Sequence, residues 1–364
     1  MARKRVLVVD DSVVVRKLVT EVIAADDGLE VCGTAPNGRI ALAKVDQLAP
    51  DLVTLDVEMP DMNGLEALSA LRESHPELPV VMFSTLTDRG ARVTLDALMR
   101  GANDYVTKPA NVGGVSQAIA AVKAELIPKV RALTGADDVR PAPPTRLSPA
   151  ARARPAASRS GSGRIDLIVV GVSTGGPNVL AEFVPHLPGD LGVPMVIVQH
   201  MPPVFTQLLA QRLDARSPLT VAEGSDGAPV QGGQVWIAPG DRHLLVRRDA
   251  GGLRLGINIG PPENSCRPSA DVLFRSAVEA CDGRVLGLVL TGMGQDGLRG
   301  SERIVEAGGS VLAQDKASSV VWGMPGAVTQ AGLAEEQLPV TGLVDSVVRR
   351  VRAGAGRAAA EAAR

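Results

Sequence analysis

Five polar residues in the first third of the chain have the types and the spacing that phosphoryl chemistry needs. Each follows or closes an apolar run: Asp10 and Asp11 after KRVLVV, Asp56 in DLVTLD, Ser84 in PVVMFS, and Lys108 after DYVT. Converging carboxylates repel one another, and a divalent cation such as Mg²⁺ offsets that repulsion. A carboxylate beside Mg²⁺, with a lysine and a hydroxyl directed at the same point, suits attack on a phosphoryl group. Any one acid could be an ordinary loop residue, but the whole set at matching strand ends predicts a phosphoryl-accepting site.

A glycine-rich turn in IDLIVVGVSTGGPNVL, residues 165–180, suggests a second kind of chemistry. It does not match the dinucleotide pattern G-x-G-x-x-G, because Ser173 stands at the second glycine, and no lysine follows the glycines as a Walker A motif requires. The segment fits G-x-S-x-G, in which a strand-to-helix turn exposes the serine oxygen. By itself the motif is short, and a plain strand-to-helix turn fits it equally well.

A histidine and an aspartate at two other strand ends favour the nucleophile. His200 closes VPMVIVQH, and Asp296 lies in the glycine-rich loop after RVLGLVL. A serine hydroxyl needs a base, and the base needs a carboxylate that fixes its tautomer and stabilises its cation. Glycines around Asp296 allow a tight loop with the backbone amides that an oxyanion requires. We therefore predict a triad of Ser173, His200 and Asp296, in a chain order unlike that of α/β-hydrolases but acceptable because triads are defined by geometry.

Other histidines and acids compete for these roles less well. His243 begins a strand, His186 lies in a proline-flanked loop, and His75 lies at a helix end, where its charge suits the dipole. Asp226 and Asp241 could replace Asp296, but neither follows so strong a buried strand. His243 and His186 are expected to be structural or exposed.

The elements that position these residues alternate along the chain. In the first third, strands are expected at residues 4–9, 29–35, 51–56, 79–84 and 104–108, and helices at 12–25, 38–48, 64–74 and 92–101. Such β-α units imply a parallel sheet covered on both faces, with the site at the carboxyl ends of the strands. Strand-like runs that end in polar groups return in the second half. The fold class is therefore α/β with two domains: a five-stranded parallel, flavodoxin-like domain and a doubly wound one.

Composition sets the domain limits and excludes several functions. We expect a first domain at 1–127, a flexible linker rich in Pro, Ala, Ser, Gly and Arg at 128–163, a catalytic domain at 164–353 and a disordered tail at 354–364. A formal net charge of -2 and 2% aromatic residues argue against nucleic-acid binding. Three cysteines without a C-x-x-C pair fit a reducing cytoplasm, and no apolar run is long enough for a spanning helix.

The motifs VLVVDDS, DLVTLDVEMPDMNGLEAL, VVMFST and YVTKP resemble the receiver domain of two-component response regulators over about the first third of the chain. The resemblance implies a set of roles: Asp56 as phosphoacceptor and Mg²⁺ ligand, Asp10 and Asp11 as further Mg²⁺ ligands, Ser84 as switch hydroxyl, Tyr105 as aromatic switch residue and Lys108 as phosphate-side cation.

The second half resembles the catalytic domain of the chemotaxis protein-glutamate methylesterases. The motifs that carry the resemblance are GVSTGGP, QHMPPVFTQLLAQRL, APGDRHLL, SCRPSADVLFRSA, LTGMGQDGLRG and SSVVWGMPGA. It implies hydrolysis of γ-glutamyl methyl esters on chemoreceptors with release of methanol, deamidation of receptor glutamines in some members, and a chemotaxis histidine kinase as phosphodonor. It also implies Thr174 and Met293 beside the oxyanion site, and no metal in this half. Gln295 and Val172 depart from the residues usual at their positions, without touching a catalytic role.

Three rival functions remain open at this stage. They are a receiver-controlled hydrolase with another acyl substrate, a binding output with an inactive triad, and a transcription factor. The last is weakest, because the second half has no basic recognition helix.

Overall fold

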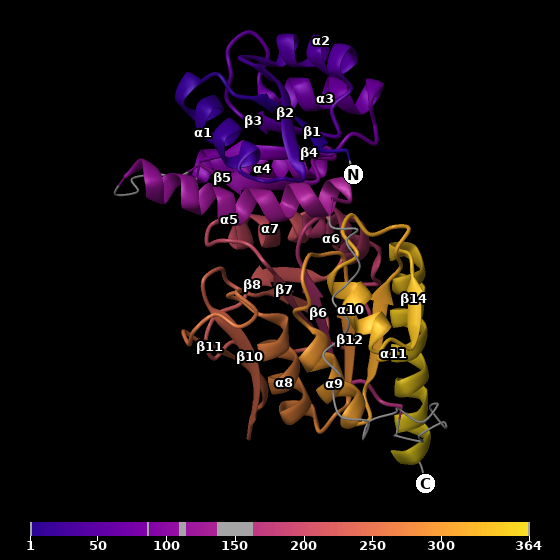
Figure 1. Ribbon diagram of the computed structural model, residues 1–364. Coiled ribbons are helices and arrows are strands. Elements are labelled where there is room, and N and C mark those ends of the chain that lie inside the picture. Colours follow the sequence, from indigo (N-terminus) through magenta and orange to yellow (C-terminus); the bar gives the residue numbers. More distant parts are fainter. Residues whose placement is uncertain (1, 86, 109–113, 137–162, 363–364) are drawn as a thin grey trace. The chain divides into compact units, whose positions relative to one another are not determined.

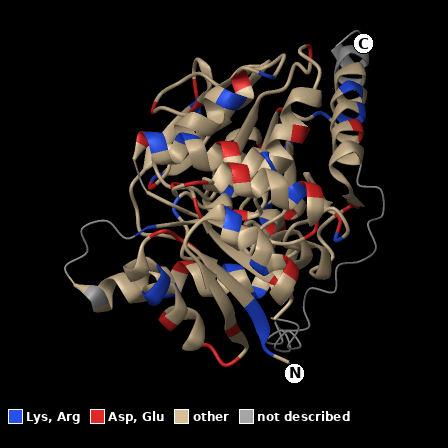
Figure 2. Ribbon diagram, turned by 90° about the horizontal axis from the view of Figure 1, so that it is seen from above, with Lys and Arg blue, Asp and Glu red and all other residues tan. Residues whose placement is uncertain are grey.

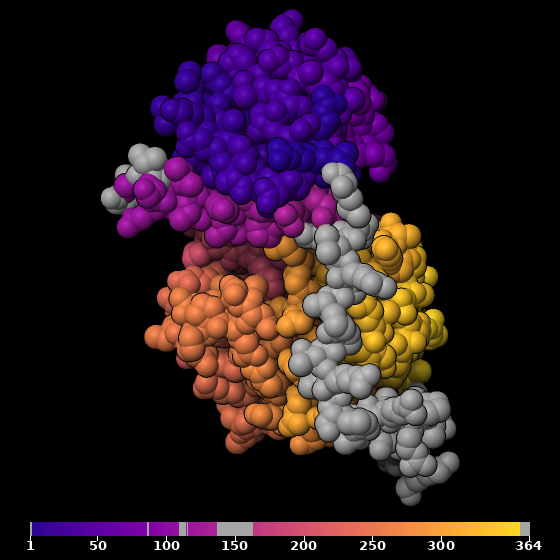
Figure 3. Space-filling model, viewed as in Figure 1, coloured from indigo at the N-terminus to yellow at the C-terminus, as the bar shows by residue number. Residues whose placement is uncertain are grey.

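The computed structural model describes residues 2–85, 87–108, 114–136 and 163–362. The chain divides into two compact units, Met1–Leu147 and Ser148–Arg364, which Figure 3 shows in different colours. Each unit has its own parallel sheet (Figure 1). Residues 137–162 of the expected linker lie outside the described residues. Basic and acidic residues alternate along the helices of the ribbon in Figure 2, in keeping with the formal net charge of -2.

The N-terminal unit is a five-stranded parallel sheet in the order β2-β1-β3-β4-β5, as expected. Its strands are β1 (Lys4–Val9), β2 (Leu29–Ala35), β3 (Leu52–Asp56), β4 (Val80–Ser84) and β5 (Asp104–Thr107). Its helices are α1 (Val13–Ala24), α2 (Gly38–Leu48), α3 (Gly64–Ser74), α4 (Asp88–Met99) and α5 (Val115–Thr134). The strand order reverses between β1 and β3, which places a crevice at their carboxyl ends.

Side-chain caps fix where four of these helices begin. Ser12, Asn37, Asn63 and Thr87 each accept a hydrogen bond from a backbone N–H of the following turn. Asn63 forms a full capping box with Glu66. These caps satisfy N–H groups that have no partner inside the helix, so each loop that follows a strand ends at a defined residue.

The helix α5 extends further than the sequence indicated. It continues through Pro128 to Thr134, so the first residues of the expected linker are helical. Val122, Leu126 and Val130 recur every four residues and are buried in a core shared with α1. This apolar stripe holds the last turns against the sheet despite the proline.

The C-terminal unit has a seven-stranded parallel sheet in the order β14-β13-β12-β6-β7-β9-β8 and a separate antiparallel hairpin. The sheet strands are β6 (Leu167–Val172), β7 (Met195–Gln199), β8 (Thr220–Glu223), β9 (Gln234–Ile237), β12 (Val285–Val289), β13 (Ser310–Gln314) and β14 (Glu336–Leu338). The hairpin pairs β10 (His243–Asp249) with β11 (Gly252–Asn258). The helices are α6 (Gly176–Phe183), α7 (Phe205–Asp214), α8 (Ala270–Cys281), α9 (Leu298–Glu306), α10 (Met324–Gln330), α11 (Val340–Ala362) and a short 3₁₀ helix (Val184–His186).

The expected disordered tail is helical as far as the structure describes it. The helix α11 runs to Ala362, and its residues Leu343, Val347 and Val351 are buried. Alanine is the strongest helix former, so an alanine-rich end can continue a helix that packing has already started. Among the described residues, none of the helices combines the length and hydropathy that crossing a membrane requires.

Candidate functional site

Three carboxylates gather at the switch point of the N-terminal sheet. Asp10 follows β1, Asp11 comes next, and Asp56 ends β3. One oxygen from each lies within 4.8 Å of the others. Because Mg²⁺ prefers oxygen ligands and is usually held by one or two carboxylates, this donor set fits that ion.

Lys108 neutralises part of this negative charge. Its Nζ lies 2.8 Å from Asp10 Oδ2 and 2.8 Å from Asp56 Oδ2. Burial raises the pKa of Asp56 to about 6, although the hydrogen bond from Lys108 opposes the rise and the charge of Asp10 adds to it. Burial alone would lower the pKa of Lys108, but its two acidic partners outweigh that effect and raise it. The lysine therefore stays charged beside a carboxylate that is ionised above pH ~6.

The two predicted switch residues differ in their surroundings. Ser84, at the end of β4, lines a cavity of about 210 Å³ together with Asp11, Asp56 and Lys108. Its hydroxyl accepts a hydrogen bond from Thr94 Oγ1 at 2.5 Å and lies 3.2 Å from Gly90 O, so it is held against α4. Tyr105 lies in β5 and is buried.

In the C-terminal unit, the three predicted triad residues follow three adjacent strands. Ser173 comes after β6, His200 after β7 and Asp296 in the loop after β12, and β6 lies between the other two strands. Val172 pairs with Gln199 in the parallel register, so Ser173 and His200 occupy the next paired positions. The strand order reverses at β6, which places all three at the switch point of the sheet.

The turn that carries Ser173 is closely packed. Gly175 adopts a φ of 80°, a left-handed conformation that favours glycine, and ends the turn. A Cβ at Gly176 would lie only 1.9 Å from Gln199 Oε1, and one at Gly292 would lie 2.8 Å from Ser173 Cβ. Gln199 Nε2 donates a 3.0 Å hydrogen bond to the Ser173 carbonyl. This is the strand-to-helix turn that the G-x-S-x-G pattern indicated. It leaves no room for a side chain at Gly176 or Gly292.

His200 and Asp296 form a direct pair. His200 Nε2 lies 2.8 Å from Asp296 Oδ2, and only 13% of the histidine side chain is exposed. Burial disfavours the charged imidazole, but the hydrogen bonds to Asp296 and to Cys266 outweigh it and raise the pKa of His200 to about 9. The proton on Nε2 is therefore directed at the carboxylate, and Nδ1 is the nitrogen left to exchange a proton.

Asp296 is held by five hydrogen-bond contacts. Besides His200, its Oδ2 accepts from the backbone N–H of Ala270 at 2.6 Å. Its Oδ1 accepts from Asn264 Nδ2 at 2.8 Å, Ser269 Oγ at 2.8 Å and the backbone N–H of Asp271 at 3.1 Å. Burial would raise the pKa of Asp296, but the His200 cation and these donors hold it well below its usual value. The carboxylate stays ionised and has one orientation.

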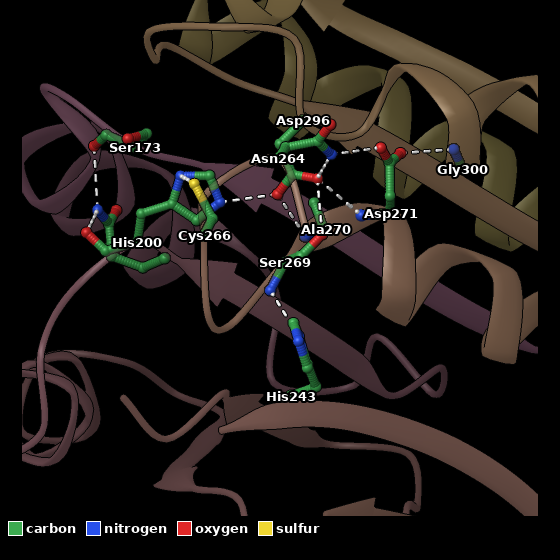
Figure 4. A network of polar contacts seen from close by, with 11 residues as sticks. Ser173, His200, His243, Asn264, Cys266, Ser269, Ala270, Asp271, Asp296 and Gly300 are labelled. Atoms are coloured by element: carbon green, nitrogen blue, oxygen red, sulfur yellow. Dashed lines mark hydrogen bonds and ion pairs between the residues drawn. The ribbon is translucent and has the colours of Figure 1, made fainter. Parts of the chain in front are cut away.

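The third contact of the triad, between Ser173 and His200, is not a hydrogen bond in the structure. Among the described residues, no hydrogen bond joins Ser173 Oγ to His200. Cys266 Sγ lies 3.6 Å from His200 Nδ1 instead. Figure 4 shows Ser173 on the side of the imidazole away from Asp296, with Cys266 over the ring. The site thus has a paired base and acid with the hydroxyl nearby.

The two expected oxyanion residues lie on either side of Ser173. Thr174 follows it directly, and its carbonyl accepts a hydrogen bond from Thr291 Oγ1. Met293 follows Gly292, which packs against Ser173. The N–H of Ser173 is bonded to the Thr291 carbonyl at 3.0 Å. The N–H of Ser173 itself is therefore already used in a backbone hydrogen bond.

The competing residues are placed elsewhere. His243 is buried, with Nε2 near the Pro261 carbonyl and Nδ1 accepting from Ser269 N–H. His186 ends the short 3₁₀ helix, and His75 caps the C-terminus of α3. Asp241 is exposed and paired with Arg267, and Asp226 accepts from the N–H of Ile257. None of these contacts is made to Ser173, His200 or Asp296.

Sequence reasoning assigned no role to the residues that surround the pair, namely Asn264, Cys266, Ser269 and Asp271. They lie in the segment that enters α8; all but Asn264 belong to the motif SCRPSADVLFRSA, which had been noted only as part of a resemblance. The start of a helix after a serine is a ready anion site, and that signal could have connected this segment with Asp296.

Comparison with known proteins agrees with both units. Residues 6–120 match the family model of the response regulator receiver domain, and residues 168–347 match that of the CheB methylesterase. A protein-glutamate methylesterase/protein-glutamine glutaminase of Nocardioides sp. is 54% identical over 95% of each chain. A protein of the same name from Trichodesmium erythraeum is 47% identical over 96% of this chain and 100% of its own. The crystal structure of the Thermotoga maritima CheB methylesterase catalytic domain is 40% identical, with a TM-score of 0.50, over 51% of this chain and 98% of that one.

These matches extend over both units and include the segments that carry Asp56, Ser173, His200 and Asp296. The chain therefore belongs to the family of protein-glutamate methylesterases/protein-glutamine glutaminases, which combine a response regulator receiver domain with a CheB methylesterase domain.

Proposed function

We propose that this chain is a phosphorylation-controlled serine hydrolase of chemotaxis adaptation, which hydrolyses glutamate methyl esters on chemoreceptors, releases methanol and deamidates receptor glutamines. The observation that carries the proposal is the full-length identity of 54% with a relative named for both activities. Its support in the structure is the placement of Ser173, His200 and Asp296 at three adjacent strand ends.

His200 is the general base and then the general acid. Its Nε2 proton is held by Asp296, so in molecules whose His200 is neutral Nδ1 accepts the Ser173 proton as Oγ attacks the ester carbonyl. Because the pKa of His200 is raised to about 9, this neutral form increases as the pH rises toward 9. The same proton passes from Nδ1 to the leaving methoxide, and methanol departs. Water then hydrolyses the glutamyl-enzyme by the reverse sequence and restores Ser173. Hydrogen bonds between nucleophile and base often tighten only with substrate bound, which fits the open contact at Ser173.

The backbone amides of Thr174 and Met293 bind the developing oxyanion. Each such donor contributes roughly 3 kcal/mol to transition-state stabilisation. The packing of Gly292 against Ser173 supports this role, because it brings the loop of Met293 up to the nucleophile. The esterase reaction needs no metal.

The receiver domain controls this reaction through Asp56. A chemotaxis histidine kinase is the phosphodonor. Asp10, Asp11 and Asp56 would hold Mg²⁺, which would supply positive charge to neutralise the phosphoryl group. Lys108 contacts the phosphoryl oxygens, Ser84 leaves α4 to bind one of them, and Tyr105 follows. The domain limits are those expected, 1–127 for the receiver and 164–353 for the esterase, lengthened by the ends of α5 to Thr134 and of α11 to Ala362. The protein acts in the cytoplasm.

The substrate is tested with the full chain and methylated chemoreceptors in membranes. We expect methanol release that follows the loss of receptor methyl groups, and ammonia release from receptors that carry glutamine at the same positions. Labelling of Ser173 by a fluorophosphonate without either product would point to another acyl substrate. Absence of labelling in the folded protein would point to an inactive, binding-only domain.

A further inference from the structure

A single amide group lies between two buried carboxylates behind the base. Asn264 Nδ2 donates to Asp271 Oδ2 at 2.8 Å and to Asp296 Oδ1 at 2.8 Å (Figure 4). Asp271 and Asp296 are 1% and 2% exposed. Both hydrogens of one NH₂ group are thus used, one for each acid.

Each of the two acids also accepts hydrogen bonds from the N-terminus of the other acid's helix. Asp296, just before α9, accepts from the N–H groups of Ala270 and Asp271 at the start of α8. Asp271, in the first turn of α8, accepts at 2.6 Å from the N–H of Gly300 in the first turn of α9. Asp296 therefore lies at the positive N-terminal end of α8, the helix that contains Asp271. Asp271 lies at the positive N-terminal end of α9, the helix that Asp296 precedes. These contacts hold the pair in place.

This arrangement brings two like charges together in a buried environment. Burial raises the pKa of Asp271 to about 6, and the charge of Asp296 adds to the rise. Among the described residues, the other charged groups near the pair include His200, on Asp296, and Glu263, which Arg275 contacts at 2.7 and 2.6 Å. Arg275 also interacts with the pair, because the charges of Asp271 and Asp296 help to raise the pKa of its guanidinium. Asn264 is a neutral donor that both acids share, so it lowers their mutual repulsion without adding charge.

The backbone at Asn264 supports a specific requirement for this residue. Asn264 and the following Ser265 have φ values of 52° and 61°, in the left-handed region. Asparagine is enriched there among residues other than glycine. The turn brings the amide back toward the acids and leads directly into Cys266, which contacts His200 Nδ1.

We propose that Asn264 is a positioning residue of the esterase reaction: by donating to both Asp271 and Asp296, it keeps Asp296 ionised and aimed at His200. The inference rests on the proposed function in that it assigns His200 and Asp296 to the hydrolysis. Without the amide, the acid pair takes up a proton more readily. The negative charge that faces His200 then falls, and the pKa of His200 falls with it.

The test uses the full chain and a double-mutant cycle. Asn264→Gly removes the amide and keeps the left-handed backbone, Asp271→Asn removes the second charge, and the double variant combines them. Asn258→Gly is the control, because the Asn258 side chain is exposed and accepts a local hydrogen bond from the N–H of Gly260. The readouts are the rate constant for fluorophosphonate labelling of Ser173, kcat and KM for methanol release, and the His200 pKa from NMR titration.

Asn264→Gly should lower the labelling rate and kcat by roughly 10-fold or more, because nothing then offsets the repulsion between the two acids and Asp296 is turned away from His200, and it should leave KM within about 2-fold. The His200 pKa should fall, and Asn258→Gly should change none of these values. In the Asp271→Asn background, where no second charge remains, Asn264→Gly should change the labelling rate by less than about 3-fold.

Wild-type labelling and an unchanged His200 pKa in Asn264→Gly would overturn the proposal, and so would effects that simply multiply in the double variant. If Asn264→Gly does not fold, Asn264→Ser is judged by the same criteria, since its hydroxyl can donate to only one carboxylate. Because labelling and titration need no receptor, failure of wild-type methanol release would refute the proposed substrate while this cycle still decides the role of Asn264.

Discussion

The substitution Asp296→Asn tests the base most sharply, because the structure dictates how the amide must sit. If its oxygen takes the Oδ1 position, it keeps the hydrogen bonds from Asn264, Ser269 and the N–H of Asp271. Its NH₂ group then faces His200 Nε2 and the N–H of Ala270. That N–H lies 2.6 Å from the Oδ2 position, so it would face a donor where it now has an acceptor. The reverse orientation would place NH₂ against three donors and is worse.

Two magnitudes follow from that geometry. Leaving the N–H of Ala270 buried without an acceptor costs about 1–3 kcal/mol of folding stability. The NH₂ group donates to His200 Nε2, so the proton moves to Nδ1, the nitrogen that should accept from Ser173. Loss of the correct tautomer lowers kcat by roughly 10³–10⁴-fold. The pKa of His200 also falls, because the carboxylate that raised it is gone.

The assay is methanol release from methylated receptor membranes, with thermal unfolding measured alongside to show that the variant is folded. Asp241→Asn is the control, because Asp241 is an exposed partner of Arg267 away from the pair. We expect Asp241→Asn to retain nearly full activity. A larger loss for Asp241→Asn than for Asp296→Asn would show that the orienting acid has been wrongly chosen.

Three further predictions concern separate parts of the molecule. Ser173→Ala should abolish methanol release and still accept phosphate on Asp56 from a small-molecule phosphodonor; measurable release above the uncatalysed rate would exclude Ser173 as nucleophile. Removing Mg²⁺ with EDTA should stop phosphorylation of Asp56 and should not change methanol release by the unphosphorylated protein. A loss of this basal methanol release would indicate a metal in the esterase reaction. Because the pKa of His200 is raised from 6.5 to about 9 in the folded protein, its contribution to stability is complete below pH ~6.5 and is lost as the pH rises through ~9. The unfolding temperature should therefore fall over this range, and fall less in Asp296→Asn; equal slopes for the two proteins would contradict the raised pKa.

The sheets and the strand-end residues could be predicted because both depend on local signals. Continuous apolar runs such as LVTLD and VLGLV mark strands buried on both faces, and the residue after each run must lie at the carboxyl edge. The adjacency of β6, β7 and β12 then brings Ser173, His200 and Asp296 to one edge.

Other features depend on packing between distant segments and have no comparable local signal. Asn264 reaches Asp296 across 32 residues, and Cys266 reaches His200 across 66, through a turn with two left-handed residues. Proline and small residues suggested a linker from residue 128 and a disordered tail from 354. Burial of Val130 against α1 and of Val351 in the C-terminal unit favours helix in both places.

The most direct test of the central claim measures Ser173-dependent methanol release with and without phosphate on Asp56. The wild type, Asp56→Asn and Ser173→Ala are each incubated with methylated receptor membranes, Mg²⁺ and either a phosphodonor or none. The account predicts that the phosphodonor raises release by the wild type, leaves Asp56→Asn at the basal rate, and has no effect on an inactive Ser173→Ala. Equal release by the wild type with and without phosphodonor, while Asp56 is shown to be phosphorylated, would contradict it.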